Sequence, residues 1–274
     1  LKGPAPDRLL HHPVDPRAPD AALAEALFKG RLTIGAQSVD CEGEIERIWD
    51  LAQSPGPMHS FLHEFVWLRH AEALGEAAAG PVRQLVRAWL DRCEKWSPEA
   101  WAPPLTGERL TQLCAHSALV MKGADALWRS RVLTSMARQT RHLARAGHRA
   151  GTDYERLMTA AGLTLAGLCL PGCGDEAERG VEILRRELRL QMRPDGAHVS
   201  RNPSQQLAIV IRLQMILKAL DARRVPAPGF LRHVIGRAAA NVQFFRAGDG
   251  RLAVFNGGYE DDARSILAAG EAVG

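Results

Sequence analysis

The stretch PSQQLAIVIRLQMILKALDA at residues 203–222 decides the fold class. A proline in the first position suits a helix start, because the first helical N–H groups have no partner inside the helix. The apolar residues cover more than one helical face: Leu207, Ile209, Val210, Ile211, Leu213, Ile216 and Leu217. A helix that is apolar on broad faces is buried on more than one side. This stretch therefore predicts helices packed in several layers.

Start and stop signals for helices divide most of the remaining chain. Thr152 and Glu155 have the spacing of a capping box, Pro171-Gly172 ends that helix, and Pro228 precedes another. Short strands are predicted only at 31–35, where a turn is the alternative, and at 252–255. We expect about eleven helices: at 20–28, 42–53, 57–74, 81–93, from Ser97-Pro98-Glu99, from Thr106 to about 121, up to 146, and at 152–170, 175–193, 203–222 and 228–245. A last helix is expected at 261–269.

The order of these helices predicts an all-α domain built from antiparallel helix pairs. Such pairs either stack into an open solenoid or close into a ring, and periodicity does not separate the two. Residues 1–19 are rich in proline and histidine and indicate an extended arm. We therefore divide the chain into residues 1–40, the arm with the first helix, and residues 41–274, the helical domain.

Composition excludes several functional classes. With 46% hydrophobic and 24% charged residues, the chain is globular, and no apolar run reaches the ~20 residues of a membrane helix. The net charge of +4 fits an anionic ligand, but no dense basic block indicates nucleic acid. Five widely spaced cysteines do not suggest a disulfide framework, and the close pair Cys169 and Cys173 lacks further metal ligands nearby. We expect no metal and no cofactor.

Two polar segments are candidates for chemistry. In FLHEFVWLR at 61–69, His63 and Trp67 share a helix face and Arg69 lies on another. This pair either lines a cleft or belongs to the core. In PDGAHVSRNP at 194–203, His198, Arg201 and Asn202 precede a helix N-terminus, which attracts anions; the alternative is that Asn202 only caps the helix.

A third candidate segment is FFRAGDGRLAVFNGGY at 244–259, where glycine clusters surround polar residues. Loops on a rigid scaffold often carry function, and the alternative is a tight turn with a solvated Asp249. Together and in this order, the three segments resemble the N-terminal helical domain of heparinase II/III-type polysaccharide lyases, in a bacterial branch. The resemblance rests on LHEFVWLR at 62–69, DGAHVSRNP at 195–203 and GDGRLAVFNG at 248–257, and it spans essentially the whole chain.

The resemblance implies an incomplete (α/α) toroid that a C-terminal β-sandwich follows in the longer protein. It also implies an acidic polysaccharide as the partner, cleavage next to a uronate by β-elimination, and a place in the cell envelope or periplasm. For elimination, a group must neutralise the uronate carboxylate, a base must remove the C5 proton, and an acid must protonate the leaving oxygen. We assign the carboxylate to Asn202 or Arg201, the base to Tyr259, hydrogen bonds or protons to His63 and His198, and the sugar subsites to Trp67, Trp101, Arg109 and Arg69.

One departure from the family pattern favours another class of function. Other branches carry a Tyr-His pair where this chain has Gln205 and Gln206, and an amide is no general base near neutral pH. A non-catalytic helical module that binds glycan or protein is therefore the alternative. A hydrolase would need two carboxylates across a cleft, for which Asp195 and Asp249 are the best-placed pair.

Overall fold

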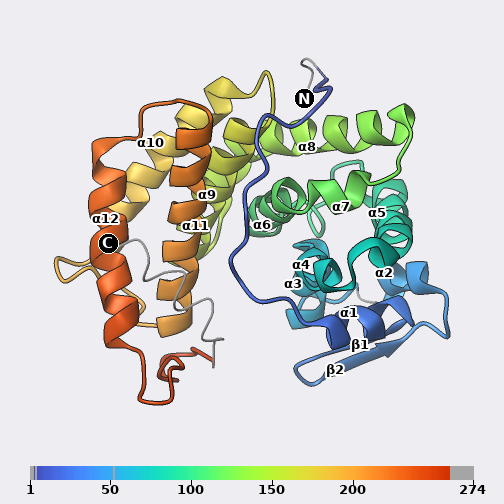
Figure 1. The fold of residues 1–274 in the computed structure, drawn as a ribbon, viewed down its shortest axis with the longest axis horizontal. Helices are drawn as coiled ribbons and strands as arrows, with labels where there is room; N and C mark the ends of the chain where they lie inside the picture. The colour runs from blue at the N-terminus through green and yellow to red at the C-terminus, as the bar shows by residue number, and fades with distance from the viewer. Residues whose placement is uncertain (1–2, 4, 52, 260–274) are drawn as a thin grey trace.

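The structure is a computed structural model that describes residues 3, 5–51 and 53–259, and these are mostly helical (Figure 1). The expected all-α class is confirmed. In chain order the elements are α1 Ala21–Phe28, β1 Arg31–Ile34, β2 Gln37–Asp40, η1 Ile45–Arg47, α2 Ile48–Leu51, α3 Pro57–His63, α4 Trp67–Ala71, η2 Glu72–Ala78, α5 Ala79–Cys93, α6 Pro103–Ala115, α7 Ser117–Met121, α8 Ala126–Ala146, η3 Gly147–Arg149, α9 Asp153–Cys169, α10 Gly174–Gln191, α11 Pro203–Ala222 and α12 Gly229–Phe244.

The helices form two halves with an extended arm between them (Figure 1). Helices α9 to α12 make one half, in which α9 packs on α10 and α11 packs on both α9 and α12. Helices α1 to α7 and the β1–β2 hairpin make the other half, and α6 joins the two by packing on α9. The arm bonds to both halves, since Leu10 N donates to Cys169 O at 2.8 Å and His12 Nδ1 lies 2.7 Å from Ser117 Oγ.

The junction between α6 and α9 depends on glycine. A Cβ atom added to Gly162 would lie 2.5 Å from Gly107 O, so the two helix backbones approach each other without a side chain between them. Helix α11 is buried on several sides, as its sequence predicts: Leu207, Ile209, Val210, Ile211, Leu213 and Ile216 are at most 2% exposed. No helix of the described part of the chain is both long and apolar enough to cross a bilayer.

Local signals placed several helix starts correctly. Thr152 and Glu155 form the predicted capping box of α9, and the Asn202 side chain accepts from Gln205 N at the start of α11. Helix α12 begins one residue after Pro228. The division of the chain at residue 40 stays a prediction, and the expected helix at 261–269 lies outside the described residues.

Other local predictions were wrong. Residues 37–40 form a strand that pairs with 31–34, whereas the sequence predicted no strand at 37–40. Ser97 begins no helix, because its hydroxyl accepts from Ala100 N in a turn and α6 starts at Pro103. The single helix expected at 57–74 breaks at Phe65, whose φ is +60°. At 252–255 only an isolated bridge between Arg246 and Leu252 forms.

Candidate functional site

A cavity of about 550 Å³, the central cavity, lies where segments far apart in the sequence meet. Its walls come from the arm, the α3–α4 turn, α6, α9 and α11. The lining residues are Arg17, Ala18, Asp20, Glu64, Val66, Arg69, His70, Glu108, Tyr154, Met158, Ala208, Ile211, Arg212 and Tyr259. Arginine, glutamate and tyrosine make up half of this lining, so the cavity offers charge and aromatic rings together.

An ionic network ties the arm to the helices around the central cavity. Arg212 donates to Glu108 Oε2 at 2.6 Å, and Arg17 Nη2 lies 3.7 Å from Glu108 Oε1. Arg17 also donates to both carboxylate oxygens of Asp15, at 2.9 and 2.7 Å. Burial alone would raise the pKa of Glu108, but the two guanidinium groups outweigh it and lower this pKa to about 2. Glu108 is therefore a fixed anion between two cations.

Glu64 also lines the central cavity, but its pKa is shifted in the opposite direction to that of Glu108. Among the described residues, its side chain forms no hydrogen bond or ion pair. Burial, and then the charge of Glu108, raise the pKa of Glu64 to about 8. A carboxyl group with this pKa carries its proton at neutral pH and can donate it. Phe65, which follows, adopts φ +60°, a conformation that is a genuine outlier for a bulky residue, and this turn sets Glu64 in the cavity wall.

Two guanidinium N–H groups at the central cavity are buried and have no partner among the described residues. They are Nε of Arg69, one of the predicted binding residues, and Nε of Arg212. Burial, and then Arg17, lower the pKa of Arg69. A buried donor without an acceptor costs about 1–3 kcal/mol, so such groups call for an explanation such as a ligand. Both arginines line the central cavity.

The second and third polar segments meet beside this cavity, at the start of α11. Asn202 Nδ2 donates to Asn256 O at 2.9 Å, and Asn256 Nδ2 donates to Arg201 O at 3.2 Å. Ser204 Oγ donates to Tyr259 O and accepts from Tyr259 N, both at 3.0 Å. These bonds hold Tyr259 at the wall of the central cavity, with 65% of the residue exposed. Asn202 thus both caps α11 and fixes the loop that carries Tyr259.

Tyr154 is a cavity residue that the sequence analysis did not select. It lies in the first turn of α9, and its ring packs edge-on against His198 with 6.1 Å between centroids. Burial, and then Glu108, raise the pKa of Tyr154, so its hydroxyl stays protonated. The one sequence signal was that the chain has only two tyrosines, Tyr154 and Tyr259.

Four predicted site residues lie in the core instead of the cavity lining. His63 Nδ1 accepts from Trp89 Nε1 at 3.1 Å, and burial, then Arg109, lower the pKa of His63 to about 3. Arg109 donates to His63 O and Gln139 Oε1 at 2.6 and 2.7 Å, and its guanidinium lies 4.4 Å from the Trp89 ring centroid. Trp67 and Trp101 are at most 3% exposed and donate to backbone carbonyls. These side chains present no surface to a sugar in this structure.

The remaining predicted residues support the loop before α11. His198 is buried and lies 2.8 Å from both Gln191 Oε1 and Ser200 Oγ, while Arg201 is exposed and pairs with Asp195 at 2.8 Å. Gln206 accepts from His198 N and donates to two backbone carbonyls, so it is a structural amide. Neither Asp195 nor Asp249 lines the central cavity, and each accepts from a backbone N–H of its own turn.

No family model matches the chain. It is 31% identical over 271 residues to the FtsZ-localized protein C of Caulobacter vibrioides, across 97% of the chain but 46% of that protein. The chain therefore spans about half the length of this curated relative. Within the described residues, no group of three or more metal-binding side chains comes together.

Solved structures decide the architecture. Heparinase III superposes on 97% of the chain with a TM-score of 0.72 and 19% identity, and the match covers 45% of that enzyme. The chain shares the heparinase III fold. Heparan sulfate lyase HepC from Pedobacter heparinus also matches, with a TM-score of 0.63 and 16% identity over 88% of the chain and 40% of that lyase. The expected incomplete toroid is confirmed, and the open solenoid is excluded.

Proposed function

We propose that the central cavity binds a uronate unit of an acidic polysaccharide and that the chain is the helical part of a β-eliminating lyase. The observation that carries the proposal is the pair of buried, unpartnered guanidinium N–H groups of Arg69 and Arg212 in the cavity wall. A guanidinium binds a carboxylate through a charge-assisted hydrogen bond, and burial strengthens that bond. The likeness of the fold to heparinase III supports the same substrate class.

The proposed reaction uses groups that line the central cavity or support its wall. Removal of the C5 proton places negative charge on the uronate carboxylate, which Arg69 neutralises. The base in this proposal is the Tyr259 oxygen, which must be ionised to accept that proton. The C5–H electron pair then forms the C4–C5 double bond, and the C4–O bond breaks. Glu64 transfers its own proton to the departing oxygen, because its raised pKa keeps it protonated at neutral pH. Asn202 positions Tyr259 through the loop.

The first test measures product and binding with the same panel of acidic polysaccharides. The unsaturated uronate product absorbs in the ultraviolet, so we expect the absorbance to rise with one panel member. Arg69→Ala should weaken the binding of that polysaccharide about 10- to 100-fold, as expected for loss of a hydrogen bond between charged groups. Arg129→Ala, an exposed arginine on α8, is the matched control and should bind like the parent. Equal binding by both variants would refute the assignment of Arg69.

A second prediction concerns the pH dependence of elimination. Because Glu64 acts in its protonated form, we expect the rate to fall as the pH rises through about 8, the pKa of this carboxyl group. Glu64→Gln keeps the shape of the side chain but has no proton to transfer, so this limb should vanish and the maximal rate should fall about 100-fold or more. If the rate of the Glu64→Gln variant falls over the same pH range as that of the parent, the titrating group is not Glu64.

A non-catalytic binding module is the second candidate function. It is favoured by Gln206, a structural amide where other branches carry half of the Tyr-His pair, and by the likeness to the FtsZ-localized protein C of Caulobacter. Polysaccharide binding with no rise in absorbance would support a glycan-binding module. Co-sedimentation with polymerised FtsZ, without polysaccharide binding, would support a protein-binding module.

A further inference from the structure

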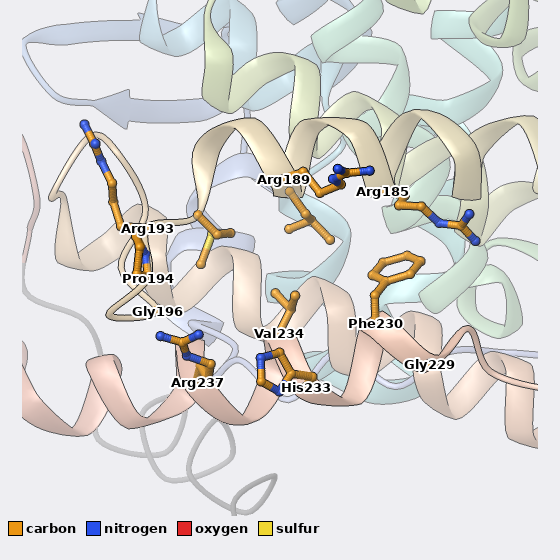
Figure 2. Close-up of a pocket in the computed structure, with 12 residues that line it drawn as sticks. Arg185, Arg189, Arg193, Pro194, Gly196, Gly229, Phe230, His233, Val234 and Arg237 are labelled. Carbon is orange, nitrogen blue, oxygen red and sulfur yellow. The ribbon is translucent and has the colours of Figure 1, made fainter.

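A second hollow, the α10–α12 groove, lies between these two helices and shares no lining residue with the central cavity (Figure 2). It has a volume of about 820 Å³. Arg185, Leu188 and Arg189 of α10, with Met192 directly after the helix, form one wall. Phe230, His233, Val234 and Arg237 of α12 form the other wall. The loop at 193–196 closes one end.

The charge of this groove has one sign. Its lining holds Arg185, Arg189, Arg193 and Arg237 and no aspartate or glutamate. Within the described part of the chain, none of these four arginines forms an ion pair with a carboxylate, although many arginines elsewhere do. Arg185 lies over the ring of Phe230, with 5.2 Å from its guanidinium carbon to the centroid. The arginines therefore form a cationic rim that is free to meet an anionic partner.

The floor between the rims is apolar. Leu188 lies in the last turn of α10 and Met192 directly follows the helix, while Phe230 and Val234 lie one turn apart on α12. In Figure 2 the Phe230 and Val234 side chains point across the groove toward the helix that carries Arg185 and Arg189. Two apolar rows of this kind are the surface on which an amphipathic helix packs.

We propose that the α10–α12 groove binds an acidic amphipathic helix of a protein partner. Apolar side chains of that helix fill the floor, and its flanking carboxylates pair with the arginine rim. The lining favours a helix over a sugar, because its floor is apolar and His233 is its one side chain that can accept a hydrogen bond from a sugar hydroxyl. Charge complementarity and the two-helix shape therefore select one occupant, and it binds independently of the central cavity.

The test uses a designed helical peptide of about 14 residues as the probe. It carries leucines along one face and glutamates on both flanks, with a fluorophore for anisotropy. We expect binding that weakens as salt is added, since it depends on charge. The double variant Arg189→Glu/Arg237→Glu should lose affinity at least about tenfold, as loss of two opposed charge pairs implies. Arg129→Glu, which makes the same charge change at an exposed site of α8, should bind like the parent.

Control ligands distinguish an acidic helix from other possible occupants of the groove. A peptide with the same leucines but lysine flanks should bind much less, and so should a scrambled acidic peptide without an apolar face. Because Arg189 and Arg237 are exposed, the variants should keep the parent's circular dichroism spectrum. The proposal is overturned if the acidic peptide does not bind at millimolar concentration. It is equally overturned if anionic vesicles or uronate oligosaccharides, and not the peptide, bind in a way that depends on Arg189 and Arg237.

Discussion

Replacing Glu108 with alanine should lower the free energy of unfolding by about 3–5 kcal/mol, the typical cost of removing one partner from a buried ion pair. The substitution leaves Arg212 without the carboxylate that it contacts at 2.6 Å, although only 3% of the Arg212 side chain is exposed. It also removes the anion that faces Arg17 of the arm. Urea denaturation, followed by far-ultraviolet circular dichroism, measures the change.

An exposed ion pair supplies the control. Asp221 lies 3.3 Å from Arg232, and both side chains are more than half exposed, so Asp221→Ala should change the unfolding free energy by less than about 1 kcal/mol. Equal decreases in unfolding free energy for Glu108→Ala and Asp221→Ala would show that the buried ion pair stabilises the fold no more than an exposed one.

The same carboxylate should set part of the acid stability. Its folded pKa, about 2, lies below the ordinary value of 4.5, so the stabilisation is complete above pH 4.5 and is lost as the pH falls toward 2. Glu108→Ala lacks this contribution at every pH. The difference in unfolding free energy between the parent and Glu108→Ala should therefore shrink as the pH falls from 4.5 toward 2. A difference that stays constant over this range would contradict the role of the Glu108 carboxylate.

Short-range signals explain how much of the fold was predictable. The box of Thr152 and Glu155 and the cap at Asn202 lie within three residues of what they stabilise, so the sequence alone located these helix starts. Ser97 shows the limit, because its hydroxyl satisfies a turn as readily as a helix N-terminus. The strand Gln37–Asp40 is largely exposed and polar, so no alternation of apolar residues indicated it.

The site was predictable only where it lies near the quoted motifs. Arg69 and Tyr259 line the central cavity, and Asn202 fixes the loop that carries Tyr259. Glu108 and Arg212 meet across 104 positions of the chain, a contact that helical periodicity does not specify.

The α3–α4 turn explains why His63 and Trp67, both predicted site residues, do not line the central cavity. Periodicity relates His63 to Trp67, but it does not tell which side of a helix faces the core. The positive φ of Phe65 interrupts the helix between them, so Glu64 reaches the cavity while both predicted residues are buried.

Replacing Tyr259 with phenylalanine should lower the rate of elimination about 10²- to 10⁴-fold, the usual contribution of a general base. The change removes only the phenolic oxygen. Ser204 bonds to the backbone of Tyr259 and Asn202 bonds to the backbone of Asn256, so the loop should keep its place. Polysaccharide affinity should therefore stay within about twofold of the parent, because an interaction made only in the transition state affects turnover alone.

Tyr154→Phe is the matched control for this prediction. Tyr154 lines the same cavity, and its phenylalanine variant keeps the ring that packs against His198, 6.1 Å away. Burial holds the Tyr154 hydroxyl in its protonated form, so it is no base, and its loss should change the rate far less than the loss of the Tyr259 hydroxyl. If Tyr154→Phe abolishes the absorbance rise and Tyr259→Phe does not, the base lies on α9, and the loop after α12 serves only to bind.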